Sequence, residues 1–358
     1  LFEGKTPASA FLNSSYDGSF IAGLMELRYI QSLPVERIIN YFESHGFTLK
    51  KPTAHKLIEK ASSLFENLYK CIRQTALSDP YKAADETYYK ILVPEKNSKG
   101  KGVRKGYLWV VVGINTRMIY LLYDDGSRSE RVILNELGSC KGIIQSDGYS
   151  PYRKLESDAY PNITRIPCLQ HIKRKFIDCG EKDPDAKRIV ELINALYQNE
   201  HKHKVGVEGW TVEQNLMHRK KYAPDILGEI KDVLDEIEER GDLLPKSELQ
   251  EAITYLRNEW NAVVDIFNYG DTYLDNNMVE RMNRYISLSR KNSLFFGSHK
   301  GAERGAILYT IALTCRMHKV NLFEYLTDVI NRTAEWQPNT PIEKYRELLP
   351  DRWEKAND

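Results

Sequence analysis

The sequence predicts an α/β fold with a large helical insertion, and three observations lead to this prediction. Apolar residues recur at helical spacing before residue 80, as in Val35, Ile38 and Phe42. From residue 85 the spacing changes to that of strands, in segments rich in Val, Ile, Leu and Tyr. Residues 183–265 then return to a helical pattern. The expected domains are a helical region over 1–84, a sheet-containing core over 85–181 and 270–335, an all-helical insertion over 182–269, and a tail over 336–358.

The composition restricts the class of protein. Of the 358 residues, 42% are hydrophobic and 28% are charged, which is typical of folded globular chains. No run approaches the roughly 20 apolar residues of a membrane span, so no membrane partner is expected. The five cysteines form no CxxC pair. This pattern argues against a disulfide framework or a zinc ribbon and favours a reducing, cytoplasmic location.

The net charge of +1 conceals a strong regional imbalance. Lys and Arg are outnumbered 12 to 18 by Asp and Glu over residues 182–269, whereas residues 281–332 contain nine basic and three acidic residues. The basic segment is compatible with a face that binds a polyanion. The alternative is a set of solvated helix faces, and charge alone does not separate the two interpretations.

The N-terminal helices have the pattern of a helix-turn-helix. The helix that contains Val35 and Phe42 is expected to end at Ser44-His45-Gly46, and the next helix starts near Pro52 and continues through Leu68. Polar residues near its start are candidate DNA contacts, namely Lys51, Thr53, His55 and Lys56. Any short helical hairpin has a similar pattern, so a purely structural role remains the alternative.

The segment from residue 85 predicts three consecutive strands, a helix and a further strand. The expected strands are 85–93, 107–114, 118–123 and 142–145, with a helix over 129–137, a fifth strand over 163–166 and a helix over 168–179. Residues 96–102 are expected to form a basic hairpin loop. This order is the opening of an RNase H-like fold, a mixed sheet with flanking helices. Two more helices are expected over 273–295 and 302–332.

Three acidic residues are candidates for a metal site. Asp85 is expected to begin the first strand and Asp147 follows the fourth, and these strands are neighbours in an RNase H-like sheet. Glu280 opens the helix expected over 273–295. Three carboxylates suit two Mg²⁺ ions, with Mn²⁺ as a substitute, because hard cations prefer oxygen ligands. The structural alternatives are a strand-entry residue, a turn former before Gly148 and a first-turn helix acid.

Five ordered motifs make the chain similar to a known family. They are Asp85-Glu86-Thr87, Gln145-Ser146-Asp147-Gly148-Tyr149, Cys168 to Phe176, Asp275 to Arg281, and Arg290 to Ser298. The set resembles the DDE transposases of the bacterial insertion-sequence family numbered sixty-six, over nearly the whole chain. Leu169 and Lys173 stand where that family usually has Trp and Arg. Many members have a cysteine-rich zinc-binding segment before the helix-turn-helix. No such cluster occurs in this sequence, so the segment either lies in a missing N-terminus or is absent.

The resemblance implies a function. Asp85, Asp147 and Glu280 would form the catalytic and metal-binding triad. Glu280 follows Asp147 by 133 positions, and the segment between them would contain the family's helical insertion. The partners would be transposon-end DNA and target DNA, in an assembly of two or more copies, with small accessory proteins from the same element. Further candidate DNA contacts are His171, Lys173, Arg174, Lys175, Arg281, Arg284, Arg290 and Lys291.

Local patterns qualify some of these contacts. Lys173, Arg174 and Lys175 are consecutive on a helix, so they do not all face one way. His171 is expected to be a hydrogen-bonding or DNA-facing residue near the active site, and the alternative is half of a metal site with Cys168.

Two other functions remain open at this stage. A metal-dependent nuclease that cuts without joining would have the same carboxylates. A transposase-derived DNA-binding protein without catalysis would have the same fold. The three intact acids argue against the second possibility.

Overall fold

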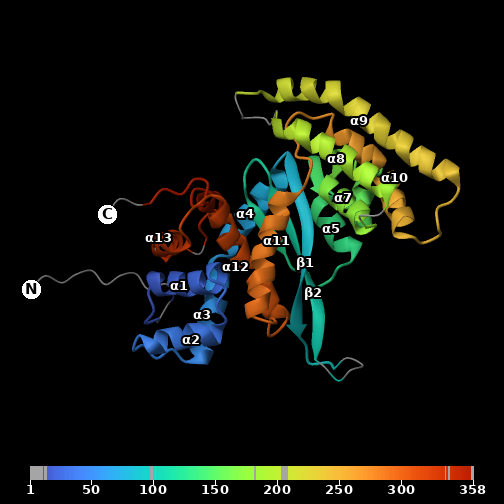
Figure 1. The fold of residues 1–358 in the computed structure, drawn as a ribbon. Coiled ribbons are helices and arrows are strands. Elements are labelled where there is room, and N and C mark those ends of the chain that lie inside the picture. The colour runs from blue at the N-terminus through green and yellow to red at the C-terminus, as the bar shows by residue number, and fades with distance from the viewer. Residues whose placement is uncertain are drawn as a thin grey trace, which may run out of the picture. The chain divides into compact units, whose positions relative to one another are not determined.

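The computed structural model describes residues 11, 14–96, 100, 102–180, 183–202, 209–334, 336–337 and 339–355, with the backbone alone at 201–202. These residues have a mixed α/β architecture, as the sequence predicts (Figure 1). They divide into two compact units. The first unit comprises residues 1–132 and 278–358, and the second comprises residues 133–277. Most of the expected basic loop at 96–102, and also Pro338, lie outside the described residues.

The first unit begins with a series of helices. They are α1 (Gly18–Met25), the π-helical turn η1 (Glu26–Ile30), α2 (Val35–Ser44), α3 (Lys51–Leu64) and α4 (Glu66–Ser78). An Oδ1 atom of Asp17 accepts the Phe20 N–H at 2.9 Å and caps α1. Helix α2 ends as predicted, and Gly46 follows with φ of 78°. The single helix predicted through Leu68 is wrong, because the chain breaks at buried Phe65 without a Gly or Pro to signal it.

Three antiparallel strands follow in the first unit. They are β1 (Tyr81–Leu92), β2 (Val103–Gly113) and β3 (Ile119–Leu122). The prediction that Asp85 begins the first strand is wrong, because β1 starts four residues earlier and Asp85 pairs with Val110 inside the ladder. The strand start is hard to recognise in the sequence because the charged residue Lys82 lies in it. Its ammonium group is buried and donates to the carbonyl oxygen of Asp79, so the charge does not mark an exposed loop.

The first unit ends with four helices. They are α11 (Asn277–Asn292), which starts at the division between the units, α12 (His299–Met317), α13 (Leu322–Ala334) and α14 (Ile342–Arg346). The single helix predicted over 302–332 is wrong, since the chain turns between α12 and α13. Lys319 has φ of 58°, and the Val320 N–H donates to the Cys315 carbonyl at 2.9 Å. A lysine holds the left-handed position where glycine usually marks a helix end.

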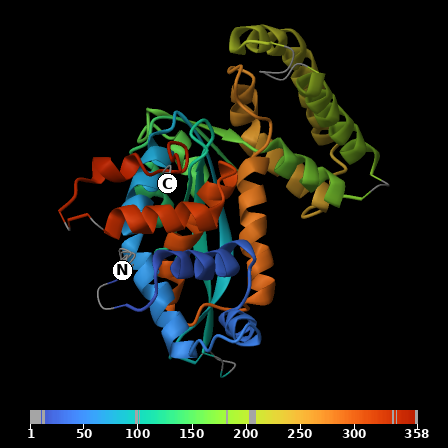
Figure 2. The same ribbon diagram turned by 90° about the vertical axis from the view of Figure 1, so that its left-hand side faces the viewer.

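Packing in the first unit brings distant segments together. Helix α4 packs on β2 and β3, α12 packs on β3, and α1 packs against α13 (Figure 2). Helix α11 runs beside β1 (Figure 1). Asn283 contacts Asp85, Arg290 contacts Tyr88, and the Phe296 N–H donates to the Lys90 carbonyl. The helix and the strand therefore advance in the same direction, by about 10 Å each between the first two contacts.

The second unit contains the remaining two strands. Its elements up to residue 178 are β4 (Gly142–Ser146), α6 (Ser150–Arg153), the 3₁₀ turn η2 (Lys154–Glu156), β5 (Ile163–Pro167) and α7 (Leu169–Asp178). Helix α5 (Glu130–Leu137) precedes them and spans the division between the units. Strands β4 and β5 are parallel, and the five strands form one mixed sheet in the order β3-β2-β1-β4-β5.

Three long helices complete the second unit. They are α8 (Pro184–Lys202), α9 (Val212–Arg240) and α10 (Glu248–Ile266). A capping box between Thr211 and Gln214 starts α9, and Gly241 with φ of 66° ends it. Buried Arg219 donates to the carbonyl oxygens of Ile266 at 3.2 Å and Thr272 at 2.6 Å. This one side chain therefore satisfies backbone acceptors where α10 ends.

Candidate active-site carboxylates

Asp85 lies within β1, where the first unit gives it two hydrogen bonds. One oxygen of its half-buried carboxylate accepts the Glu86 N–H at 2.8 Å, and the other accepts the side-chain amide of Asn283 at 2.6 Å. Asn283 lies three residues after Glu280 on α11, so the two side chains are neighbours on one helix face. The structure therefore brings Asp85 to the part of α11 that carries Glu280.

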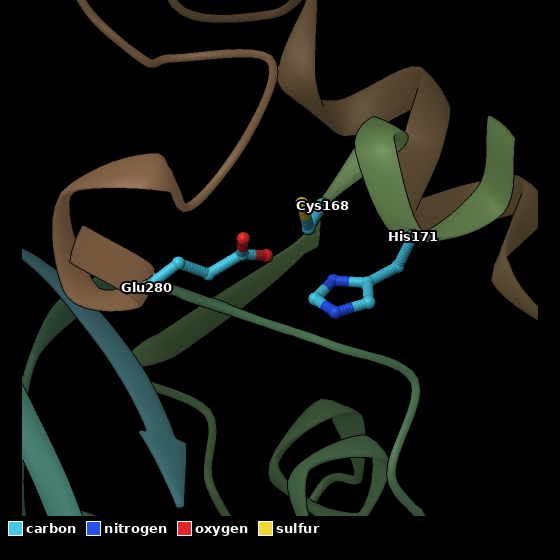
Figure 3. A group of neighbouring side chains, drawn as sticks. All are labelled: Cys168, His171 and Glu280. Atoms are coloured by element: carbon cyan, nitrogen blue, oxygen red, sulfur yellow. The ribbon is translucent and has the colours of Figure 1, made fainter. Parts of the chain in front are cut away.

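Glu280 projects from the first turn of α11 (Figure 3). An acid at this position also interacts favourably with the helix dipole, so the helix and the carboxylate stabilise each other. The side chain is half-buried, and its Oε1 atom is shielded from solvent.

Asp147 lies in the second unit, at the first position after β4. Its Oδ1 atom accepts the Tyr149 N–H at 3.1 Å, which forms a turn closed by the side chain. Its Oδ2 atom has no hydrogen-bond donor among the described residues. One carboxylate oxygen is thus fixed and the other is available to a ligand.

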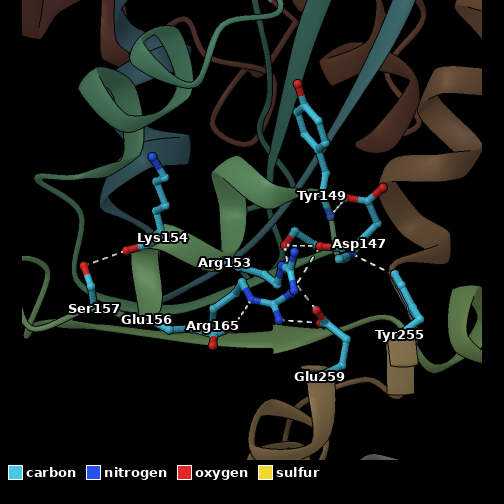
Figure 4. Close-up of polar contacts among 11 residues, drawn as sticks. Asp147, Tyr149, Arg153, Lys154, Glu156, Ser157, Arg165, Tyr255 and Glu259 are labelled. Atoms are coloured by element: carbon cyan, nitrogen blue, oxygen red, sulfur yellow. Dashed lines mark hydrogen bonds and ion pairs between the residues drawn. The ribbon is translucent and has the colours of Figure 1, made fainter. Parts of the chain in front are cut away.

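A buried arginine supports the turn that carries Asp147 (Figure 4). The Nη1 atom of Arg165, on β5, donates to the Asp147 carbonyl at 3.1 Å and lies 3.5 Å from the Ser146 hydroxyl. The same guanidinium group forms ion pairs with Glu259 of α10 and with Glu156. Arg165 and Glu259 are 2% and 1% exposed, so their charges are compensated by charged protein groups and not by water.

A second contact from α10 holds the next residue of the turn. The Gly148 N–H donates to the Tyr255 hydroxyl at 2.8 Å (Figure 4). A Cβ atom at Gly148 would lie 2.5 Å from that hydroxyl oxygen, so the contact requires glycine. Burial raises the pKa of Tyr255, as does the nearby Glu259, so its hydroxyl stays neutral.

The pKa of Glu259 is subject to two opposing effects. Burial raises it, and the adjacent Arg165 guanidinium lowers it. Since an arginine stays protonated, we regard the pair as ionised at neutral pH.

Sequence reasoning missed Arg165, Tyr255 and Glu259, although two signals were present. Arg165 is the single charged residue of the apolar strand 163–167, and Glu259 interrupts the apolar face that Leu256 and Val263 share on α10. A charge at a core position on each element predicts a buried pair.

The cluster at the start of α7 lies in the second unit. Cys168 precedes the helix and His171 lies in its first turn, as Figure 3 shows. Their potential ligand atoms are within 4.8 Å of each other. The Cys168 sulfur also accepts the backbone N–H of Asn276 at 3.4 Å, which gives this buried thiol a structural role.

The three consecutive basic residues of α7 point to different surroundings. Lys173 and Lys175 each lie 5.8 Å from an aromatic ring centroid, of Tyr197 and Tyr255 respectively. Arg174 is exposed between them. Each of the two lysines thus contacts an aromatic ring on a different helix, α8 for Lys173 and α10 for Lys175.

The basic residues of α11 divide into two sets. Arg281, Arg284 and Lys291 are exposed and form no ion pair with any described residue. Arg290 instead donates to the Tyr88 carbonyl and lies 3.9 Å from the centroid of the Tyr88 ring.

The candidate contacts near the start of α3 are accessible to different degrees. Lys51 forms an exposed ion pair with Glu36 of α2. His55 and Lys56 are exposed, and Thr53 is half-buried. Partial burial, and then the charge of Lys51, lower the pKa of His55, so this side chain is neutral at physiological pH.

The donor set of the three acids fits a hard divalent cation. Asp85, Asp147 and Glu280 offer only carboxylate oxygens, and the free Oδ2 atom of Asp147 has lone pairs to give. Within the described residues, no helix combines the length and the apolar character needed to cross a membrane.

Comparisons with known proteins identify the family. Residues 13–304 match the family described as Transposase IS66 family, so the chain belongs to that family. It is 26% identical over 367 residues to the uncharacterized protein y4jD of Sinorhizobium fredii (strain NBRC 101917 / NGR234), an alignment that covers 99% of this chain and 69% of y4jD. It is 25% identical to y4hP and 28% identical to y4qI of the same strain, over 90% and 73% of this chain. Those alignments cover 60% and 49% of the two relatives. Membership in a transposase family implies that the chain acts on DNA.

Proposed function

We propose that the chain is a DDE transposase that cleaves DNA at the ends of its element and joins them to target DNA. The observation that carries the proposal is the family match over residues 13–304, which includes Asp85, Asp147 and Glu280. We assign the catalytic roles to these three carboxylates.

The strand order supports an RNase H-like core. Three antiparallel strands are followed by two parallel ones, and β1 and β4 are neighbours in the order β3-β2-β1-β4-β5. In such a core Asp85 and Asp147 belong to adjacent strands. The helices α8, α9 and α10 are then the insertion between the second and third acids.

The three acids would hold two Mg²⁺ ions, or Mn²⁺ in their place. When bound, such ions activate the attacking oxygen and stabilise the leaving oxygen of a phosphodiester. The chain's own residues orient the ligands. Asn283 fixes one oxygen of Asp85, and Arg165 and Tyr255 bind the carbonyl and the N–H of the peptide bond that follows Asp147.

Two reactions follow from this assignment. Water cleaves the phosphodiester at the element's end, which yields a free 3′-hydroxyl and a 5′-phosphate. That hydroxyl then attacks a phosphodiester of target DNA, so that a new P–O bond forms as the bond to the target strand's 3′-oxygen breaks and that oxygen leaves as a 3′-hydroxyl. Neither step needs a covalent protein–DNA intermediate.

We assign DNA binding to two further regions of the first unit. Helices α2 and α3 would form a helix-turn-helix that contacts the transposon end through Thr53, His55 and Lys56. The exposed cations of α11 would contact phosphates near the cleavage site.

The test is cleavage and joining of the element's own flanking DNA in Mg²⁺ or Mn²⁺. The variants Asp85→Asn, Asp147→Asn and Glu280→Gln should each abolish both reactions while the fold and most DNA binding persist. Circular dichroism and binding without metal are the controls. Cleavage retained in any one variant would remove that residue from the triad. Pre-cleaved ends that are never joined would identify a nuclease instead.

A further inference from the structure

The hairpin of β1 and β2 exposes a face with an unusual set of side chains. Tyr88 lies directly opposite Tyr107, and Lys90 lies directly opposite Lys105. Side chains two residues apart on a strand point to the same side, so these four share one face. Both lysines are exposed, Tyr88 is 37% exposed, and Tyr107 is half-buried. We call Tyr88, Lys90, Lys105 and Tyr107 the ribbon face.

The two lysines form a close pair of like charges. The Lys90 carbonyl accepts the Phe296 N–H, and the Leu92 N–H donates to Phe296, so these groups of β1 point away from β2. Lys90 and Lys105 are therefore a non-hydrogen-bonded pair, the kind in which opposite side chains come closest. Like charges at such positions destabilise a sheet. Stability of the fold does not explain this arrangement.

Neither lysine is neutralised by an acid. Among the described residues, no carboxylate forms an ion pair with Lys90, Lys105 or Arg290. The acid on this side of β1, Glu86, is already paired with Arg128. The ribbon face and Arg290 thus carry three uncompensated positive charges.

The tyrosine rings hold two of these cations in place. The Lys105 ammonium lies 4.2 Å from the Tyr88 ring centroid and 5.3 Å from that of Tyr107. The Arg290 guanidinium lies 3.9 Å from the Tyr88 centroid. Such cation–π contacts orient a cation without neutralising it, so its charge remains available to an anion.

We propose that the ribbon face binds the phosphate backbone of duplex DNA. This inference rests on the proposed function, because only a protein that acts on DNA has that polyanion as its partner. Arg290 belongs to α11, and the exposed Arg281, Arg284 and Lys291 lie on the same helix beside β1. The ribbon face therefore extends the basic surface of α11 across the hairpin. Its contacts are to phosphates and are independent of DNA sequence.

The test uses opposite effects on stability and binding. Lys90→Thr removes the like-charge contact, and Lys90→Glu replaces it with an opposite-charge pair. Both variants should melt at the parent's temperature or above it and should bind duplex DNA more weakly. For Lys90→Thr the slope of log affinity against log salt should fall by about 0.9, so the affinity ratio between 50 and 200 mM salt shrinks about 3.5-fold.

Arg104 supplies a matched control. It is exposed on the same hairpin, and its partner Ile91 places it on the opposite face of β2 from Lys105. Arg104→Thr and Arg104→Glu make the same charge changes and should alter the binding of a random-sequence duplex less. Binding is measured by fluorescence anisotropy without divalent metal, so that cleavage does not interfere.

The outcomes separate the two proposals. If the parent binds DNA and both Lys90 variants bind with the parent's affinity and salt slope, the ribbon face is wrong and the proposed function stands. Equal losses in the Lys90 and Arg104 variants would also overturn the ribbon face, since they indicate only a long-range charge effect. If the parent binds no DNA, both proposals fall.

Discussion

The two units position a candidate carboxylate in different ways. Asp85 lies inside the β1–β2 ladder, where the neighbouring backbone pairs fix its Cα position, and one side-chain amide orients it. Asp147 lies beyond the end of β4, where no ladder fixes the chain. The second unit instead uses Arg165 and Tyr255 to bind the turn. A carboxylate within a strand needs one orienting contact, whereas one in a turn needs a support built from other elements.

The support of Asp147 also gives the helical insertion a role. Tyr255 and Glu259 both come from α10, more than a hundred residues after the turn that they hold. The insertion is therefore part of the candidate site's framework and not only a connection between the second and third acids.

The largest effect is expected for Glu259→Ala. This change leaves the buried Arg165 guanidinium with Glu156 as its one remaining acidic partner among the described residues, and removal of one partner from a buried pair typically costs about 3–5 kcal/mol. Urea unfolding measures the loss. Glu156→Ala is the control, because the Glu156 side chain is 36% exposed, and its loss should cost about 0–1 kcal/mol. Equal losses in the two variants would contradict a buried, mutually dependent pair.

A double variant separates stability from positioning. Arg165→Met with Glu259→Leu removes both charges, so the fold should recover most of the stability that Glu259→Ala loses. Cleavage should stay impaired, because the Asp147 carbonyl has lost its donor, and the apparent Mg²⁺ requirement should rise. Normal cleavage and metal dependence in a stable double variant would show that Arg165 does not position Asp147.

A smaller effect is expected for Asn283→Ala in the first unit. The amide donates to an ionised carboxylate, and such a bond is worth about 1.5–3 kcal/mol. If this energy orients Asp85 for catalysis, cleavage falls by about 10- to 150-fold. The melting temperature should change little, since β1 stays paired with β2. Ser287→Ala is the control, because its hydroxyl bonds only within α11. A loss of cleavage no greater than in this control would remove Asn283 from the site.

The comparison also explains what the sequence could predict. The strands follow from local patterns, and the family match confirms the family that the ordered motifs indicate. The roles of the three acids stay predictions. Asn283 escaped prediction because a hydrogen bond to a residue 198 positions away has no local signature. Arg165 and Glu259 were visible only as charges at core positions, and pairing them requires knowing that β5 and α10 meet. The start of the first strand was predicted too late, because a lysine such as Lys82 usually indicates an exposed loop, whereas its ammonium group is buried here.

Tyr255→Phe should have a milder effect on the second unit. It leaves the Gly148 N–H without its acceptor and costs about 0.5–1.5 kcal/mol of stability. The cleavage rate should fall by a larger factor than the decrease in folded protein accounts for. Gly148→Ala should be worse than Tyr255→Phe, because its methyl group collides with the ring as well as the hydroxyl. Unchanged cleavage in Tyr255→Phe would mean that Arg165 alone holds the turn.

The smallest effect is expected on the surface of α11, where the first unit carries its free cations. Arg284 and Lys291 are exposed without an ion-pair partner in the described part of the chain, and they lie on one helix face with Arg281. Replacing both with Ala should weaken DNA binding for all sequences. The log–log salt slope should fall by about 1.8, or about 0.9 for each lost phosphate contact.

Lys220→Ala with Lys221→Ala is the control in the second unit, since these lysines are equally exposed on the acidic insertion. That control should keep the parent's slope, because nearby acids repel phosphate from the insertion. An unchanged slope in the folded α11 variant would instead indicate a solvated helix face. Equal changes of the salt slope in both double variants would mean that DNA binding is not specific to the cations of α11.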